Sequence, residues 1–151
     1  MLQDDPIVEK RRALARAALE DAKDKSTDWA YGVPAKGWKC NIFCGDKMRA
    51  LGMYPKEEGY ISAGTWGDEN TEIAGWQILK NEPPQAGDIG AYSRSSGTTT
   101  GHMGIMNSST KIIYAGSDYV KTATIQGFNQ EAANRGYTIT WVYRRFVGFN
   151  K

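Results

Sequence analysis

The sequence contains a single histidine, His102, and two cysteines, Cys40 and Cys44, and these side chains define the nucleophilic chemistry open to it. A thiolate can attack a carbonyl carbon, and an imidazole that titrates near neutral pH can serve as its general base. Cys40 stands where a helix is expected to begin, and the free N–H groups and dipole at such a position favour the thiolate. Cys40 and His102 can therefore supply a nucleophile and its base, provided that the fold brings them together.

Other residues of these types have plainer interpretations. Cys44 follows Cys40 by one helical turn, and we expect it to pack in the core. The spacing of the two cysteines matches no zinc or iron–sulfur ligand set, so we expect no metal site. Hydrolysis by a thiol nucleophile and an imidazole base requires no cofactor, and we expect none. Asp88 is expected to close an Asx-type turn before a strand. Arg144 and Arg145 are neighbours on a late strand, where we expect a solvated face.

Two helices followed by a run of strands are expected to position these side chains. Residues 6–25 carry the apolar stripe of a helix, and a second helix is expected over residues 40–51, with Gly52 ending it. Residues 53–82 show no regular pattern and predict a long loop. Short apolar or alternating stretches predict strands at 89–93, 102–106, 111–115, 120–124 and 137–146. This order predicts an α+β fold, with N-terminal helices packed on an antiparallel sheet of about five strands.

Length and composition exclude several classes of protein. A chain of 151 residues with 40% hydrophobic and 24% charged residues predicts one globular domain over residues 1–151, with an N-terminal helix (1–25) and a core (27–151). The net charge of +2 is too small to indicate nucleic-acid binding. No apolar run approaches the roughly 20 residues of a membrane helix. Residues 1–5 are acidic where a secretory signal would be basic and then apolar, so we expect no Sec export.

Four short strings resemble one enzyme family in their order and spacing. They are Trp-Ala-Tyr-Gly at 29–32, Lys-Cys-Asn-Ile-Phe-Cys at 39–44, Pro-Gln-Ala-Gly-Asp-Ile at 84–89 and Gly-His-Met-Gly-Ile-Met at 101–106. They resemble the NlpC-like cysteine peptidases, in which the Cys begins a helix and a Gly-His-Val-Gly-Ile strand carries the base. The Lys-Cys-Asn-x-Phe form is similar to the amidase effectors of type VI secretion. The resemblance spans residues 27–116 and implies a papain-like, NlpC-type fold with catalytic Cys40 and His102.

The resemblance also implies a third catalytic position. In the family a polar residue that orients the histidine lies on the next strand, where this chain has Tyr114. Ser117 and Asp118 follow closely, and an Asp accepting from the imidazole best stabilises its protonated form. Asp118 is therefore the preferred candidate, while Ser117, Tyr114 or a bare Cys–His dyad remain open.

Four residues are expected to contact the substrate: Trp29, Tyr31, Asn41 and Trp66. Trp29 stands where many family members have a tyrosine whose hydroxyl helps the oxyanion site, and Tyr31 can take that role. Asn41 flanks the nucleophile, where most members have Ser. Trp66 can line a substrate groove or anchor a long loop.

The implied activity is that of a peptidoglycan amidase or endopeptidase that cleaves an amide bond in the cell-wall peptide stem by a thiol mechanism. The chain looks like an antibacterial effector toxin, made in the cytoplasm without a Sec signal and delivered to the periplasm of a target cell. An immunity protein in the producer is expected to block the Cys40 cleft. Two alternatives stay open: a thiol acyltransferase or deamidase of the same fold acting on a protein or lipid, and a non-catalytic wall-binding module.

Overall fold

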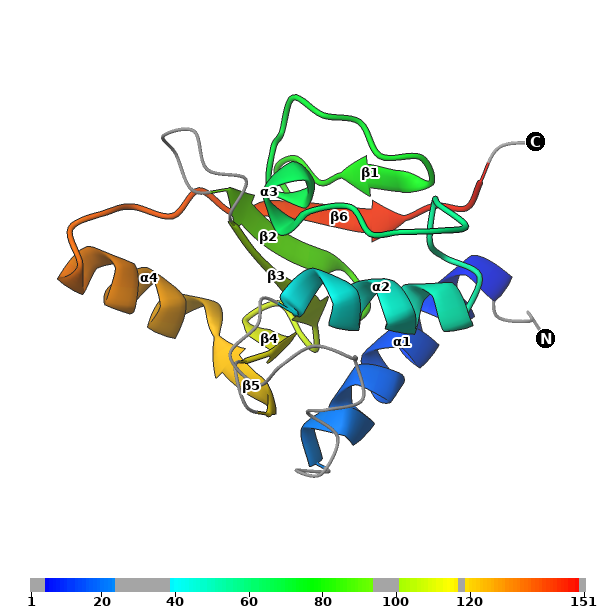
Figure 1. Ribbon diagram of the computed structural model, residues 1–151, viewed down its shortest axis with the longest axis horizontal. Helices are drawn as coiled ribbons and strands as arrows, with labels where there is room; N and C mark the ends of the chain where they lie inside the picture. Colours follow the sequence, from blue (N-terminus) through cyan, green and yellow to red (C-terminus); the bar gives the residue numbers. More distant parts are fainter. Residues whose placement is uncertain (1–4, 24–38, 94–100, 117–118, 150–151) are drawn as a thin grey trace.

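The computed structural model describes residues 5–23, 39–93, 101–116 and 119–149. Within them, a six-stranded antiparallel sheet in the order β1-β6-β2-β3-β4-β5 is flanked by helices (Figure 1). In chain order the elements are α1 (Pro6–Lys23), α2 (Cys40–Ala50), α3 (Ala63–Trp66), β1 (Trp76–Ile78), β2 (Ile89–Ser93), β3 (Gly101–Met106), β4 (Lys111–Ala115), β5 (Val120–Thr124), α4 (Ile125–Asn134) and β6 (Val142–Phe146). The predicted α+β class and antiparallel sheet are confirmed.

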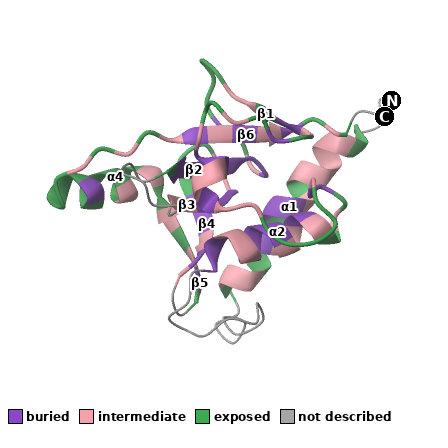
Figure 2. Ribbon diagram, turned by 45° about the horizontal axis from the view of Figure 1, so that its top comes forward, coloured by how far each residue is buried: buried purple, intermediate pink, exposed green. Residues whose placement is uncertain are grey.

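The main core lies between one face of the sheet and the helices α1 and α2. Helix α1 contributes Leu14 and Ala18, and α2 contributes Phe43, Cys44 and Met48, all of them fully buried. Buried residues gather where these two helices meet the sheet, whereas α4 lies on the other side of the sheet (Figure 2). Burial of this continuous apolar face provides the main favourable term that holds α2 in place.

Both helices and four of the strands fall close to their predicted positions. Helix α2 ends at Ala50, and Gly52 beyond it adopts the positive φ of 70° that favours glycine. Strands β2, β4 and β5 have the predicted bounds, and β3 begins one residue earlier, at Gly101. The pattern of apolar residues thus located the elements that carry Cys40 and His102.

The prediction was wrong in three places. Residues 53–82 contain the short helix α3, which Ser62 caps by accepting the Thr65 N–H, and the edge strand β1. The last strand, β6, covers residues 142–146 rather than the predicted 137–146. A helix, α4, follows β5 directly, because Thr124 caps it by accepting the Gly127 N–H at 2.9 Å.

The prediction that Arg144 and Arg145 are solvated was also wrong. Arg144 is fully buried, and its guanidinium donates to the carbonyl oxygens of Trp66 (2.9 Å) and Asp68 (2.8 Å), near the C-terminus of α3. Helix C-termini leave carbonyl oxygens without intrahelical donors, so a cation is favoured there. Arg144 therefore fastens the segment that follows α3 to the sheet.

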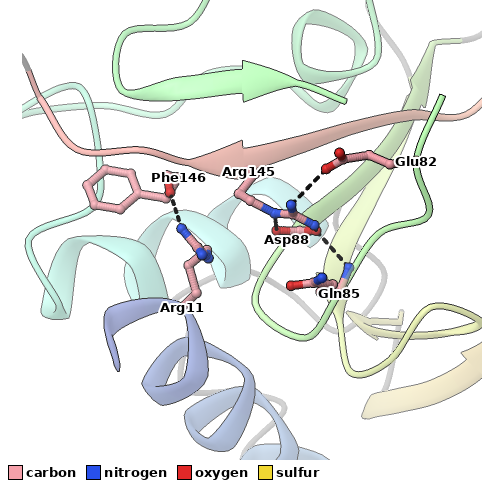
Figure 3. A network of polar contacts seen from close by, with 6 residues as sticks. All are labelled: Arg11, Glu82, Gln85, Asp88, Arg145 and Phe146. Carbon is pink, nitrogen blue, oxygen red and sulfur yellow. Dashed lines mark hydrogen bonds and ion pairs between the residues drawn. The ribbon is translucent and has the colours of Figure 1, made fainter. Parts of the chain in front are cut away.

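Arg145 fastens the turn that precedes β2 (Figure 3). Its guanidinium binds both carboxylate oxygens of the fully buried Asp88, at 3.0 and 2.8 Å, and reaches Glu82 at 2.8 Å. Asp88 also accepts the Gln85 N–H at 2.7 Å, so it closes the turn as predicted, but through an N–H three residues before it rather than by the Asx-type turn that was expected. Charge-assisted, bidentate contacts of this kind fix geometry strongly. The turn of residues 85–88 thereby fixes the register of β2 against β3.

Candidate active site

Cys40 is the first residue of α2, and the start of this helix has no side-chain cap. Lys39 at the cap position accepts the Phe43 N–H through its carbonyl at 2.9 Å, but it offers no side-chain acceptor to the helix. The first N–H groups of a helix need partners from outside the helix. Here the N–H groups of Cys40 and Asn41 lie near the Cys40 sulfur and lower the pKa of its thiol, in the positive field of the helix N-terminus.

A third N–H group reaches this sulfur from the sheet, that of Met103 on β3. Met106 on the same strand donates to the Asp88 carbonyl, toward β2. Because N–H groups alternate in direction along a strand, the Met103 N–H points toward β4. In the register of the described residues, pairing of β3 with β4 stops at Ile105 and Ile113. The Met103 N–H therefore lies beyond the paired part of β3 and β4, and it is directed to the Cys40 sulfur instead.

Burial controls the protonation of this thiol. The Cys40 residue is only 7% exposed, and burial raises the pKa of its thiol above the ordinary value. The three backbone N–H groups lower that pKa but do not outweigh the burial. The N–H groups of the helix start act in the predicted direction and favour the thiolate, but burial has the larger effect on the thiol pKa. A thiol in this setting needs a base to remove its proton.

His102, one residue before Met103, is half-buried among aromatic rings. The centroid of its imidazole lies 5.0 Å from that of Tyr114 on β4 and 5.0 Å from that of Phe128 on α4. Tyr92, its cross-strand partner on β2, lies at 6.0 Å. Edge and tilted arrangements at these distances are favourable ring contacts. The rings enclose the imidazole, and its Nε2 atom is buried.

Cys40 and His102 thus approach the same short segment of β3. The sulfur reaches it through the Met103 N–H from the side of α2. The imidazole packs with Phe128 of α4, on the other side of the sheet (Figure 2). The two groups therefore approach adjacent residues of β3 from opposite faces of the sheet, beside the point where its pairing with β4 stops. Proton transfer between them requires the imidazole to turn toward the α2 side.

Two of the four expected substrate contacts can be placed. The side-chain amide of Asn41 donates to the Ile61 carbonyl at 3.3 Å, which ties the first turn of α2 to the segment before α3. Trp66 is fully buried, and its ring packs edge-on against Trp76 with centroids 5.4 Å apart. Of the two roles left open for Trp66, burial favours the loop anchor over the substrate groove. Trp29 and Tyr31 lie outside the described residues.

Of the three candidates for the third catalytic position, the structure describes one. Asp118 and Ser117, two of its three candidates, lie outside the described residues. Tyr114, the third candidate, packs its ring edge against the imidazole with an interplanar angle of 75°. Its position on β4, beside His102 on β3, is where the resemblance places an orienting residue.

Sequence reasoning missed Tyr92 and Phe128 as neighbours of the imidazole. Tyr92 could have been found from the register of the β2–β3 pair, in which it stands opposite His102. Phe128 and the buried Ala132 are four residues apart in a helix that Thr124 caps, and that pattern is readable in the sequence. The contact of α4 with His102 is a tertiary relationship that neither pattern contains.

No group of three or more His, Cys, Asp or Glu side chains in the described part of the chain is arranged to hold a metal ion. Both cysteines are free thiols. Among the helices that the structure describes, none combines the length and the apolar character needed to span a membrane.

Comparison with protein-family models and with curated proteins finds no match for this chain.

Proposed function

We propose that this protein is a cysteine amidase in which Cys40 is the nucleophile and His102 the general base. The observation that carries the proposal is that the backbone N–H groups of the α2 start and of Met103, the residue that follows His102, lie near the Cys40 sulfur and lower the pKa of its thiol. Backbone N–H groups gathered around a reacting atom can also stabilise an oxyanion that forms beside it. The four sequence strings, in the order of the NlpC-like peptidases, support the same assignment.

The proposed reaction proceeds through a thioester. His102 takes the proton of the Cys40 thiol as the sulfur attacks the carbonyl carbon of the amide. The tetrahedral oxyanion is stabilised by backbone N–H groups at the start of α2. As the C–N bond breaks, the imidazolium gives its proton to the leaving amine. Water then attacks the thioester, His102 accepts a proton from it, and the carboxylic acid leaves as the thiol is restored.

A raised thiol pKa fits this sequence of steps. Because burial raises the pKa of the Cys40 thiol, proton transfer to His102 is expected to accompany substrate attack rather than precede it. This differs from an enzyme with a stable thiolate–imidazolium pair, whose cysteine is reactive before substrate binds.

We propose the peptide stem of bacterial peptidoglycan as the substrate, cleaved by an effector-type enzyme that reaches the target-cell periplasm and that an immunity protein blocks in its producer. Purified wild-type protein is incubated with defined stem-peptide fragments, and the products are identified by mass. Release of one new amino group and one new carboxyl group per cleavage supports a hydrolase. Transfer of the acyl part to an added amine or lipid, without net hydrolysis, would support an acyltransferase instead.

Two substitutions separate the nucleophile from its structural neighbour. Cys40→Ala should abolish product formation while its circular dichroism and unfolding midpoint stay close to the wild type. Cys44→Ala is the matched control, because Cys44 is fully buried one turn further along α2 and packs in the core. It should lower stability but leave cleavage measurable at low temperature. Loss of cleavage in Cys44→Ala but not in Cys40→Ala would refute the assignment.

A further inference from the structure

The start of α2 is fastened from outside the helix. Its first turn carries Cys40 and the backbone N–H groups that the proposed reaction uses, yet Lys39 provides no side-chain cap. Uncapped first turns fray, because their N–H groups have no intrahelical partners. Here the side-chain amide of Asn41 donates to the carbonyl oxygen of Ile61 at 3.3 Å. This acceptor belongs to the return segment, residues 53–61, which runs from the end of α2 back toward its start (Figure 1).

Tyr54 holds the return segment at the residue that Asn41 contacts. The Ile61 N–H donates to the Tyr54 hydroxyl at 2.6 Å, while the carbonyl oxygen of the same residue accepts from Asn41. Tyr54 is buried, so its hydroxyl offers a fixed acceptor. Both backbone polar groups of Ile61 are thus engaged, and a shift of Tyr54 would be passed to Asn41 through this one residue.

Arg49 joins Tyr54 to the last turn of α2. Its guanidinium carbon lies 4.6 Å from the centroid of the Tyr54 ring, a favourable cation–π distance. The same guanidinium donates to the Gly59 carbonyl oxygen at 2.7 Å. A continuous set of contacts therefore runs from the last turn of α2, through Tyr54 and Ile61, to its first turn.

Tyr60 lies on the same segment but is attached at a different place. Its ring also faces Arg49, with 5.1 Å between the guanidinium carbon and the ring centroid. Its hydroxyl donates to the Asp46 carboxylate at 2.6 Å, in the middle of α2. The two tyrosines thus share a segment and a cation, and they differ in whether the hydroxyl acts on the first turn of the helix.

Resting on the proposed amidase function, we propose that Tyr54 and Asn41 are positioning residues that act through Ile61 to hold the backbone N–H group of Asn41 in place for the oxyanion. This N–H lies near the Cys40 sulfur, beside which the oxyanion forms. Such donors are effective when they are fixed before the reaction, because no reorganisation is then needed as the charge develops. The side chain of Asn41 serves the protein in this role and is not a substrate contact.

Hydrogen exchange tests the fastening without catalysis. Tyr54→Phe removes only the hydroxyl that Ile61 contacts, and Tyr60→Phe is the matched control. The Phe43 N–H reports on the first turn, because it donates to the Lys39 carbonyl oxygen at 2.9 Å. We expect its exchange to be roughly three- to tenfold faster in Tyr54→Phe, the effect of one lost hydrogen bond, and unchanged in Tyr60→Phe. No increase in Tyr54→Phe, or an equal increase in Tyr60→Phe, overturns the proposal.

The kinetics of stem-peptide cleavage test the role in the reaction. We expect Tyr54→Phe to lower kcat about tenfold with KM unchanged, because a displaced oxyanion donor weakens binding of the transition state and not of the substrate. Asn41→Ala should lower kcat at least as much, and Tyr60→Phe should keep the wild-type value. The double variant of Tyr54 and Asn41 should be no slower than Asn41→Ala, because both residues act through Ile61. Losses that multiply in the double variant, or a raised KM with unchanged kcat, overturn the proposal.

The two experiments distinguish failure of this proposal from failure of the amidase. Wild-type cleavage with an unchanged kcat in Tyr54→Phe overturns the positioning role and leaves the amidase standing. Faster exchange in Tyr54→Phe alone, with no cleavage of any stem peptide by the wild-type protein, overturns the amidase and leaves the fastening of α2 standing.

Discussion

The sulfur of Cys40 accepts a hydrogen bond from the backbone N–H of Met103, and this contact joins the start of α2 to the strand that carries His102. The donor is available because β3 and β4 pair only from Ile105 and Ile113 onward in the described register. The helix start supplies two further N–H groups to the same sulfur. A nucleophile placed in this way is surrounded by donors but buried, and the predictions below follow from that combination.

The reactivity of the two thiols should differ and should rise with pH. Burial raises the pKa of Cys40, so alkylation of the native protein by iodoacetamide should be slow at pH 7 and accelerate through pH 9, because only the thiolate reacts. Cys44, whose pKa burial raises further, should remain unlabelled until the protein unfolds. Peptide mapping by mass spectrometry at several pH values measures both. Rapid labelling of Cys40 that is constant between pH 6 and 8 would show instead a preformed thiolate.

The same shift makes stability depend on pH in the alkaline range. The folded protein keeps these thiol protons at pH values where the unfolded chain, with an ordinary thiol pKa of about 8.5, has lost them. The unfolded state then binds fewer protons, so the free energy of unfolding falls as pH rises above that value. Tyr143, whose pKa burial raises to about 12, continues the decline above pH 10.

Phe128 should influence the activity through the imidazole that it contacts. Phe128→Ala removes a ring whose centroid lies 5.0 Å from that of His102 and leaves the imidazole free to turn. Misplacement of a reacting group by about 1 Å can cost on the order of 100-fold in rate, so we expect kcat to fall by roughly ten- to 100-fold with KM nearly unchanged. Phe149→Ala, at a 41% exposed position that contacts Phe146, is the control and should leave kcat unchanged. Equal kcat values in the two variants would remove Phe128 from any positioning role.

Arg145 should matter more for stability than other ion-paired arginines. Arg145→Ala leaves the fully buried Asp88 carboxylate without its bidentate partner, a change that costs about 3–5 kcal/mol in buried pairs. Arg135→Ala removes an exposed pair with Glu131 on α4 and should cost about 0.3–0.5 kcal/mol. Urea unfolding of both variants measures the difference. Similar losses would mean that Asp88 finds another partner or water when Arg145 is removed.

Two glycines with nearly the same backbone conformation provide a matched pair for the turn before β2. Gly87 has φ of 90°, and a Cβ atom there would lie 2.1 Å from the Arg11 carbonyl oxygen of α1. Gly136 has φ of 89° with no atom within 4 Å of a Cβ. Gly87→Ala should therefore cost about 3 kcal/mol from strain and collision together, and Gly136→Ala about 1 kcal/mol from strain alone. Denaturant unfolding of both variants measures the two losses in unfolding free energy. Equal losses would show that α1 shifts away from the new Cβ atom without penalty.

The sequence predicted the elements of the site better than the contacts between them. Helix α2 and strands β2 to β5 follow from local patterns, namely an apolar face, a glycine after the helix and short apolar stretches. The position of Cys40 at a helix start is likewise local. Met103 could not be found in this way, because its role depends on where β4 stops pairing with β3.

Arg144 shows why the remaining features were missed. In the sequence it is one of two adjacent charges on a late strand, which is typical of a solvated face. In the structure its guanidinium is buried because Trp66, 78 residues earlier, offers a carbonyl oxygen at the end of α3. That acceptor exists only once α3 has packed on β2, so no local pattern contains it. The aromatic surroundings of His102 are non-local in the same sense, since they join β2, β3, β4 and α4.

The central claim is that Cys40 forms a covalent thioester with its substrate. Wild-type protein is mixed with a stem-peptide substrate, quenched in acid within milliseconds to seconds, and analysed by intact mass and peptide mapping. We predict a transient mass increase equal to the acyl half of the substrate, located on the peptide that contains Cys40 and absent from Cys40→Ala. Substrate cleavage that proceeds at the wild-type rate in Cys40→Ala, with no acyl adduct on the wild-type protein, would contradict it.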